Sequence, residues 1–286
     1  MLLKQILKKA PILGAFFIVL LVLNSSDAFA RNCISDALST PEKATVKWVY
    51  DGDTLLLTDK RKIRLIGIDT PEVKHHKQKA QAYGAKAREA LRELLKRNNY
   101  KILLRFEKEK LDRFSRLLAH VYTPDGMNIS NWLLEEGFAR TLSIPPNILL
   151  AECYKRSEKM AKEQSLKIWR LKSHQPLNAE GLSIRRKGYV RLQGKIDKIK
   201  YRKKSIMIEL ATKNKRPIRI KISNKNLRYF KKDMLENLLG SRIEISGILK
   251  KRHGKRTIYL NYPTQISTLK TKAKKVAPMI KWSLQK

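Results

Sequence analysis

Charged side chains stand at both ends of a short apolar run in residues 64–72, with the sequence Arg-Leu-Ile-Gly-Ile-Asp-Thr-Pro-Glu. The apolar residues predict a half-buried strand that starts at Arg64 and stops at Asp69-Thr70-Pro71. Because proline restricts the backbone after the strand, Asp69 and Glu72 are expected to be held in a defined place. Taken alone, the same residues also fit an ordinary strand followed by an Asx-type turn.

Two further stretches supply charged groups that a barrel could bring to the same place. Asp53 lies in the turn Asp51-Gly52-Asp53-Thr54, and Arg116 follows a charged segment, residues 108–115. Two carboxylates with a backbone carbonyl and water form a hard-oxygen site that suits Ca²⁺. A third carboxylate can orient or deprotonate a water molecule, and two arginines can hold a phosphate whose charge grows in the transition state. Together these groups predict cleavage of phosphodiesters.

The strands around these residues predict a small closed barrel. An Asp-Gly pair between two β-rich runs is a strong hairpin signal, and it occurs inside Thr45–Thr58. Further strands are predicted over Lys62–Ile68, Lys101–Glu107 and Arg116–Tyr122. Five short strands interrupted by one helix and followed by two more helices favour an OB-type barrel with helices packed outside.

Three helices are predicted to accompany this barrel. The first is expected over Gln78–Arg97 and the second after Asn128, with Gly137 at its C-terminal end. After Pro145-Pro146, a long amphipathic helix is expected from about Ile148 to Leu171.

From about Thr45 to Trp169 the chain resembles the staphylococcal nuclease (thermonuclease) family. The shared motifs, in chain order, are Asp51-Gly52-Asp53-Thr54, residues 64–72, Lys74-His75, Tyr83-Gly84, the segment Asp112 to Arg116 leading into Ala119-His120-Val121-Tyr122, and Ile168-Trp169. The resemblance implies a Ca²⁺-dependent nuclease that cuts DNA and RNA and leaves 3′-phosphates.

The resemblance also implies a role for each residue of the predicted site. Asp53 and Asp69 would bind Ca²⁺ through their side chains, and Thr70 would bind it through its carbonyl. Glu72 would be the general base for the attacking water. Arg64 and Arg116 would hold the phosphate and stabilise the pentacovalent state. Contacts to nucleic acid are expected from Lys74, Tyr83 and Arg113.

The sequence departs from the family pattern in two places. Phe114-Ser115 stands where the family usually has Tyr-Gly, which removes a phenol and restricts the backbone before Arg116. The family's nucleotide-stacking tyrosines have no counterpart in residues 141–145. These changes put base preference and single-nucleotide affinity in question, but they leave the metal carboxylates in place. His75 and His76 lie in a lysine-rich loop and are expected to face solvent rather than a metal.

The positive charge of the chain is large and uneven. The sequence holds 63 Lys and Arg against 25 Asp and Glu; residues 31–180 carry 29 basic and 19 acidic side chains, and residues 181–286 carry 31 and 5. Such an excess indicates a polyanion partner for the second half, with nucleic acid first and anionic envelope polymers second.

The second half predicts another, smaller OB-like barrel. Its predicted strands are Val190–Tyr201, Ser205–Ala211, Pro217–Ser223, Arg242–Lys250 and Thr257–Asn261, with a helix from Asn224 to Gly240 between the third and fourth. The predicted organisation is a nuclease-like domain over 31–173, a linker over 174–188, a basic OB-like domain over 189–269 and a lysine-rich tail over 270–286.

Basic hairpins of this second domain are expected to contact nucleic acid without reading its sequence. The residues singled out are Lys203, Lys204, Lys251, Arg252, Lys255 and Arg256. Tyr189, Tyr229 and Tyr259 either join this cationic surface or belong to the core.

The first 30 residues match a secretory signal peptide, and the two cysteines follow it. Three lysines precede an apolar run, Pro11 to Leu23, and Ala28-Phe29-Ala30 fits a cleavage site. The run is too short for a membrane span, so export to the periplasm or medium is expected, with an uncleaved anchor as the alternative. In an oxidising compartment Cys33 and Cys153 are expected to form a disulfide, and two free thiols are the alternative.

The sequence as a whole therefore predicts an exported, largely nonspecific nuclease with an added polyanion-binding barrel. The alternative is a nuclease-like protein that is weak or inactive in catalysis and only binds nucleic acid. All five charged residues of the predicted site are present, namely Asp53, Arg64, Asp69, Glu72 and Arg116, and this favours the enzyme.

Overall fold

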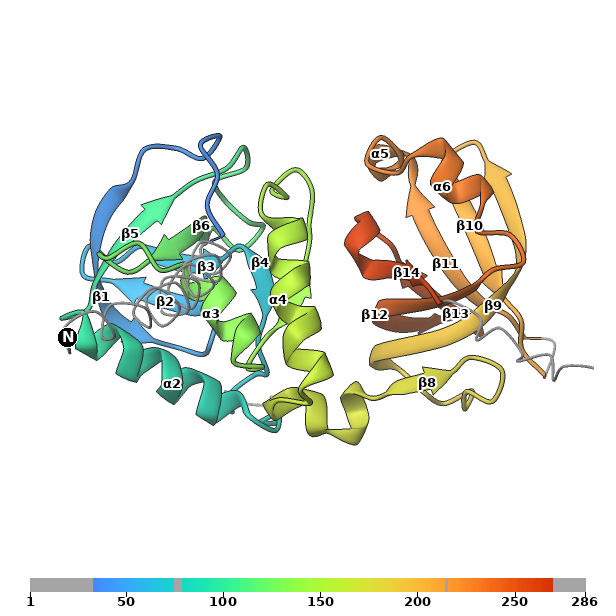
Figure 1. Cartoon of the computed structure of the whole chain (residues 1–286), viewed down its shortest axis with the longest axis horizontal. Coiled ribbons are helices and arrows are strands. Elements are labelled where there is room, and N and C mark those ends of the chain that lie inside the picture. Colours follow the sequence, from blue (N-terminus) through green and yellow to red (C-terminus); the bar gives the residue numbers. More distant parts are fainter. Residues whose placement is uncertain (1–32, 75–78, 214–215, 270–286) are drawn as a thin grey trace, which may run out of the picture. The chain divides into compact units, whose positions relative to one another are not determined.

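The computed structural model describes residues 33–74, 79–213 and 216–269, and the chain divides after Gln175 into two units (Figure 1). The predicted signal peptide, the lysine-rich tail and the histidines 75 and 76 lie outside the described residues. Within the described residues, no helix is long and apolar enough to cross a membrane.

The first unit is built on a closed five-stranded barrel, as predicted. Its strands are β1 (Glu42–Val49), β2 (Thr54–Leu57), β3 (Lys62–Leu65), β5 (Lys101–Arg105) and β6 (Leu117–Tyr122). They close in the order β1-β2-β3-β6-β5, with β3 parallel to β6 and β1 antiparallel to β5. Alternate side chains point into the barrel, so residues such as Leu55, Ile63 and Leu104 are completely buried.

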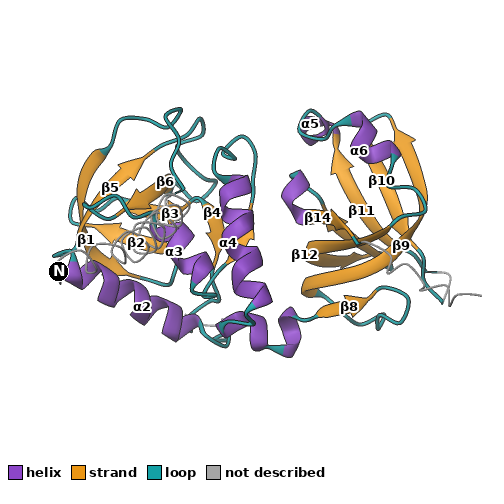
Figure 2. Cartoon of the chain, in the orientation of Figure 1, coloured by secondary structure: helices purple, strands orange, loops and turns teal. Residues whose placement is uncertain are grey.

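Three helices pack outside this barrel, but two of them are shorter than predicted (Figure 2). α2 (Gly84–Arg97) begins after Tyr83, whose backbone is left-handed with φ 71°, rather than at Gln78. α3 (Ile129–Glu135) begins as predicted, because the Asn128 side chain accepts a hydrogen bond from the N–H of Asn131 at 2.9 Å.

The prediction of one long helix over Ile148–Leu171 was wrong. α4 (Ala151–Glu163) ends before Ser165 and Lys167, which have positive φ angles of 52° and 38°, and two short 3₁₀ turns, η1 (Lys167–Arg170) and η2 (Lys172–His174), follow. The chain turns here because the N–H of Ile168 bonds to the carbonyl of Gly137 at 3.1 Å. A Cβ at Gly137 would lie 2.7 Å from the Leu166 side chain, so the close approach needs glycine.

The strand predicted over Lys62–Ile68 is divided in two. β3 ends at Leu65, and β4 (Gly67–Asp69) leaves the barrel to pair with β7 (Arg140–Leu142), a strand that was not predicted. Gly67 permits the change of direction with a φ of 85°, and a Cβ there would lie 2.4 Å from the ring of Tyr154. The turn thus lets Asp69 leave the barrel wall and approach β7.

The second unit contains a second five-stranded barrel of the same topology, as predicted. Its strands are β9 (Gly188–Arg202), β10 (Ser205–Leu210), β11 (Ile218–Ser223), β12 (Arg242–Arg252) and β13 (Lys255–Tyr259). β9 pairs with both β10 and β12, which closes the ring, and β11 runs parallel to β13. The short helices α5 (Asn224–Leu227) and α6 (Lys232–Glu236) lie between the third and fourth strands in the chain. η3 (Pro263–Gln265) and β14 (Ile266–Thr268) follow the barrel, and β14 pairs with β12.

Most of the segment predicted as a linker, residues 174–188, belongs to the second unit. β8 (Pro176–Asn178) pairs in parallel with β9, and Ala179 and Leu182 are buried in the second core. The segment contains few apolar residues, and for this reason its composition indicated a linker. The buried Ala179 and Leu182 are nevertheless enough to anchor it to the second core.

A disulfide joins the N-terminal arm to α4, as predicted. Cys33 is bonded to Cys153, with a Cα–Cα distance of 5.8 Å and 120 residues of sequence separation. The arm is also held by its backbone, because the carbonyl of Cys33 accepts hydrogen bonds from Tyr122 Oη at 3.0 Å and Asn128 Nδ2 at 2.9 Å.

Replacing both cysteines by serine should lower the free energy of unfolding by about 2–5 kcal/mol, since a crosslink over a long loop restricts the unfolded chain. Thermal denaturation of the variant and of the oxidised protein measures this. Equal melting temperatures with and without reductant would contradict it, as would two titratable thiols in the denatured, unreduced protein.

Ser115 holds a backbone conformation that glycine prefers. It lies in the loop between β5 and β6, directly before Arg116, and its φ is 59°. A side chain in this region costs about 1 kcal/mol relative to glycine. Ser115→Gly should therefore raise the free energy of unfolding by about 0.5–1 kcal/mol in urea denaturation. Ser115→Ala is the matched control, because it removes the hydroxyl but keeps the Cβ; an equal gain in both variants would exclude the backbone explanation.

Candidate active site

Arg64 joins the two aspartates that were predicted to bind metal. Its Nη1 lies 2.9 Å from Asp53 Oδ1 and its Nη2 lies 3.2 Å from Asp69 Oδ1. Asp53 comes from the turn between β1 and β2, Arg64 from β3 and Asp69 from the end of β4. Three separate elements therefore meet at one guanidinium, and the side chain of Arg64 is only 12% exposed.

The Asp53 carboxylate is held by the loop after β4 as well as by Arg64. Its Oδ2 accepts hydrogen bonds from the N–H and the hydroxyl of Thr70, at 2.8 and 3.1 Å. Its Oδ1 accepts a further bond from the hydroxyl of Thr54 at 3.1 Å. Burial raises the pKa of Asp53 to about 6, although the charge of Arg64 acts in the opposite direction.

The turn that carries Asp53 is shaped by its own residues. Asp51 Oδ1 accepts a hydrogen bond from the N–H of Asp53 at 2.9 Å, which stabilises the turn. A Cβ at Gly52 would lie 2.7 Å from Thr70 Cγ2, so glycine allows the turn to pack on the loop after β4.

Arg140 is a second cation on Asp69 that the sequence analysis missed. Its Nη2 forms an ion pair with Asp69 Oδ2, and the two residues are directly paired between β4 and β7. The neighbouring Thr141 is anchored to α4, because its N–H and hydroxyl donate to the buried Glu158 carboxylate at 2.9 and 3.1 Å. No local motif marks Arg140, since its place depends on a strand pairing 71 positions apart in sequence.

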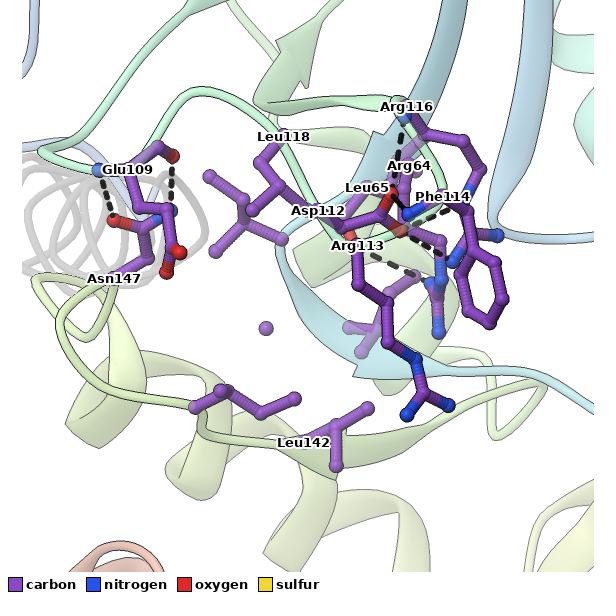
Figure 3. A pocket seen from close by; sticks show the side chains of 14 residues that line it. Arg64, Leu65, Glu109, Asp112, Arg113, Phe114, Arg116, Leu118, Leu142 and Asn147 are labelled. Carbon is purple, nitrogen blue, oxygen red and sulfur yellow. Dashed lines mark hydrogen bonds and ion pairs between the residues drawn. The ribbon is translucent and has the colours of Figure 1, made fainter.

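Arg116 is fixed by Asp112 in the loop before β6 (Figure 3). Its Nε and Nη2 lie 2.8 and 2.7 Å from Asp112 Oδ2, while Asp112 Oδ1 accepts hydrogen bonds from the backbone N–H groups of Phe114 and Arg116. The pKa of Asp112 lies below its usual value, because these hydrogen bonds outweigh the opposite effect of burial. Asp112 was not predicted as a site residue, although it lies within a shared motif.

Arg64 and Arg116 line the same cavity, as the sequence predicted, and Arg113 lines it too. The cavity has a volume of about 410 Å³. The Phe114 ring lies against both loop arginines, with its centroid 4.7 Å from Arg113 Cζ and 5.5 Å from Arg116 Cζ. The remainder of the wall includes Leu142, Ile144, Glu109 and Asn147, of which all but Ile144 are labelled in Figure 3.

Glu72, Lys74 and Tyr83 lie outside the set of residues that line this cavity. Glu72 is half-buried, and its carbonyl accepts a hydrogen bond from the N–H of Gln81 at 2.9 Å. A Cβ at Gly84 would lie 2.4 Å from that carbonyl, so glycine lets α2 start against the Glu72 segment. Lys74 is exposed, whereas Tyr83 packs on the core.

The donor atoms around Asp53 fit a hard cation. Asp53 and Asp69 offer carboxylates and Thr70 offers a backbone carbonyl, which are the oxygen ligands that Ca²⁺ takes. A buried carboxylate with a raised pKa is one whose charge a cation would stabilise. No cluster of three or more His, Cys, Asp or Glu side chains suited to a metal occurs in residues 33–74, 79–213 and 216–269. The fit therefore depends on two carboxylates and a carbonyl.

The basic residues predicted in the second unit divide into two groups. The exposed ones lie in the β9–β10 and β12–β13 hairpins and are Lys203, Lys204, Lys251, Arg252 and Lys255. Arg256 differs from the prediction, because it is 3% exposed and its guanidinium donates to the carbonyls of Leu182 and Arg216 at 3.0 and 2.6 Å. It holds the chain before β9 rather than offering a charge to solvent.

The three tyrosines singled out in the second unit also differ from one another. Tyr229 packs on the second core, Tyr189 is partly buried, and Tyr259 is 45% exposed. Of the three, Tyr259 has the largest surface available to a ligand.

Comparisons with known proteins match the unit that contains this site. The sequence model described as "Staphylococcal nuclease homologue" matches residues 62–171, which lie in the first unit. The chain is 37% identical over 130 residues to the SPbeta prophage-derived endonuclease YokF of Bacillus subtilis (strain 168), which covers 44% of this chain and 43% of that protein.

Two thermonucleases are matched over more of their length. That of Staphylococcus intermedius is 35% identical over 133 residues, covering 45% of this chain and 76% of the relative. That of Staphylococcus hyicus is 33% identical over 140 residues, covering 47% and 81%. Because most of each thermonuclease is matched, and the first unit forms the expected closed barrel, this chain belongs to the staphylococcal nuclease family.

Proposed function

We propose that this chain is a Ca²⁺-dependent nuclease that hydrolyses phosphodiester bonds of DNA and RNA without sequence preference. The observation that carries the proposal is the meeting of Arg64 and Arg116 at one cavity, with Arg64 bridging Asp53 and Asp69. Two guanidinium groups at one cavity suit a phosphate that gains charge during cleavage. The names of the relatives, endonuclease and thermonuclease, agree with this chemistry.

Asp53, Asp69 and the carbonyl of Thr70 are the groups proposed to hold Ca²⁺. When bound, the ion supplies positive charge to a phosphate oxygen and to water. Arg64 neutralises both carboxylates in the structure, so a cation at this place would leave its N–H groups available to substrate. Arg140 would continue to balance Asp69 from the side of β7.

Glu72 is proposed as the general base, with a 3′-phosphate as the product. A carboxylate that is not bound to the metal can accept a proton from the attacking water. Arg116 is held by its Nε and Nη2 on Asp112, which orients the rest of the guanidinium and lowers the entropy lost on binding phosphate. Arg113 adds a further positive charge to the cavity wall.

Aliphatic side chains in the cavity favour weak discrimination between bases. Leu142 and Ile144 line it from residues 141–145, the segment in which the family's stacking tyrosines have no counterpart, and Ile144 is 51% exposed. Apolar contact with a base needs no particular hydrogen bond, so it tolerates every base. Phe114 remains as an aromatic surface on the opposite loop.

We also infer that the protein is exported. The pattern in residues 1–30 supports this, and so does the disulfide between Cys33 and Cys153, since disulfides persist mainly in oxidising compartments.

Glu72→Gln should lower kcat about 10²–10⁴-fold, because it removes the proton acceptor. Arg116→Ala should lower kcat about 10²–10³-fold, because it removes a charge at the phosphate. The assay is degradation of plasmid DNA and of RNA with Ca²⁺ or EDTA. Matched controls are Glu93→Gln and Arg92→Ala, both on the exposed side of α2.

Absence of Ca²⁺-dependent cleavage by the unaltered protein would overturn the proposal in favour of a protein that only binds nucleic acid. Equal losses in the control variants would instead attribute the effect to the fold.

Ca²⁺ affinity should fall as the pH decreases through about 6. The folded-state pKa of Asp53 is raised from 3.8 to about 6, so this carboxyl is protonated below that pH and must lose its proton to bind Ca²⁺. Calorimetric titration should show nearly constant affinity above about pH 7 and a decrease of up to about tenfold per pH unit below 6.

The number of protons released on Ca²⁺ binding gives a second readout, obtained from buffers of different ionisation enthalpy. It should rise toward one as the pH falls, and Asp53→Asn should abolish the rise. Asp125→Asn, an exposed acid, is the control. Affinity that is independent of pH between about 5 and 7 would show that Asp53 is not a ligand.

A further inference from the structure

The outer face of the second barrel carries two rows of side chains across its paired strands. The first row contains Lys200, Met207, Lys221 and Tyr259, each of which is directly paired with the next on the neighbouring strand. The second row contains Lys198, Glu209, Arg219, Thr257 and Lys250. We call these nine residues the cationic face.

The position of the intervening row shows that both rows point outward. Between them the paired residues are Ile208, Ile220 and Ile258, all of which are completely buried in the second core. Because side chains alternate across a strand, the residues before and after each isoleucine lie on the opposite side of the sheet. Strands β9, β10 and β11 run side by side in Figure 1, in agreement with their pairing.

The charge of this face is almost entirely positive. It holds five Lys and Arg side chains and one carboxylate, Glu209. Glu209 is 6% exposed, and its oxygens lie 3.0 Å from Lys200 Nζ and 3.4 Å from Arg219 Nε. The one negative charge is therefore covered by two of the cations and offers little repulsion to a polyanion.

Tyr259 provides an aromatic surface among these cations. Its side chain is 45% exposed, it is paired with Lys221, and Lys250 Nζ lies 5.5 Å from its ring centroid. An exposed ring beside lysines suits a ligand that has both flat bases and phosphates. A duplex keeps its bases stacked inside, and an anionic polysaccharide has none, so neither would use the ring.

The basic hairpins extend this face at both ends. β10 is antiparallel to β11, and β13 is parallel to β11. The β9–β10 turn with Lys203 and Lys204 therefore lies at the end where β11 finishes, and the β12–β13 turn with Arg252 and Lys255 lies at the end where β11 begins. Cations thus occur along the whole length of the strands.

We propose that the cationic face binds single-stranded nucleic acid, with Lys200 and Lys221 on phosphates and Tyr259 stacked on a base. This site is separate from the cavity of the first unit and does not depend on cleavage there. The second barrel thereby supplies a base-stacking contact that Leu142 and Ile144 in the first cavity do not provide.

Binding of a fluorescein-labelled, mixed-sequence single-stranded oligonucleotide to the full chain in EDTA tests the lysines by fluorescence anisotropy. Lys200→Ala with Lys221→Ala should weaken binding and reduce the slope of log affinity against log salt by about 1.4, since each single-strand phosphate contact contributes about 0.7. The matched control is Lys225→Ala with Lys231→Ala, which removes the same charge from exposed positions between β11 and β12. An equal change of slope in this control would overturn the proposal.

Tyr259→Ala should weaken single-strand binding roughly 5- to 100-fold without changing the salt slope, and Tyr259→Phe should bind as the unaltered protein does. Circular dichroism and thermal denaturation confirm that each variant is folded. If Tyr259→Ala has no effect, and a duplex or dextran sulfate competes as well as the single strand, the face is a general polyanion contact and the proposal is wrong.

Discussion

The bridge from Arg64 to Asp53 and Asp69 is the interaction on which the site of the first unit depends. Two carboxylates that share one guanidinium repel one another, and the buried Asp53 also loses hydration. One guanidinium with two parallel N–H groups compensates both, because it reaches Asp53 at 2.9 Å and Asp69 at 3.2 Å. The same bridge ties the β1–β2 turn, β3 and the end of β4 together, so electrostatics fix the backbone around the cavity.

Packing from α4 maintains this arrangement from outside the barrel. Tyr154 fills the space that a Cβ at Gly67 would need, and so it sets where the chain turns from β3 into β4. Its hydroxyl lies 2.8 Å from His120 Nδ1, and the other ring nitrogen of His120 lies 2.8 Å from Glu107. Burial lowers the pKa of His120, although the bond to Glu107 opposes this. The imidazole of His120 thus connects β6 to α4 inside the fold.

Glu158, also on α4, supports the site from another direction. It is 1% exposed, bonds to the backbone of Thr141, and is compensated by Lys155 and Lys162 at 3.1 and 2.6 Å. This anchors β7, and β7 carries Arg140 to Asp69. The helix thus holds the strand that balances the second carboxylate.

The two units use one topology for different surfaces. In both, the first strand pairs with the second and the fourth, and the third runs parallel to the fifth. The first barrel places its charges where β3 and β4 separate, which makes a cavity. The second keeps its strands paired and places its charges on the outer side of the sheet, which makes a face suited to an extended polymer.

The sequence by itself predicted both barrels, the arginines Arg64, Arg113 and Arg116 that line the cavity, and the pairing of the two cysteines. These predictions depend on local patterns, namely alternating apolar residues, the Asp-Gly turn and the motif from Arg64 to Glu72. Such patterns can be interpreted without knowing which distant segments they contact. Only the tertiary structure decided the role of Arg140, the burial of Arg256 and the early end of α4. Each of these depends on contacts between distant segments: β7 against β4, Leu182 against β13, and Leu166 against Gly137. A basic residue looks the same in sequence whether it meets a carboxylate, a buried carbonyl or solvent, because its partner is supplied by the fold.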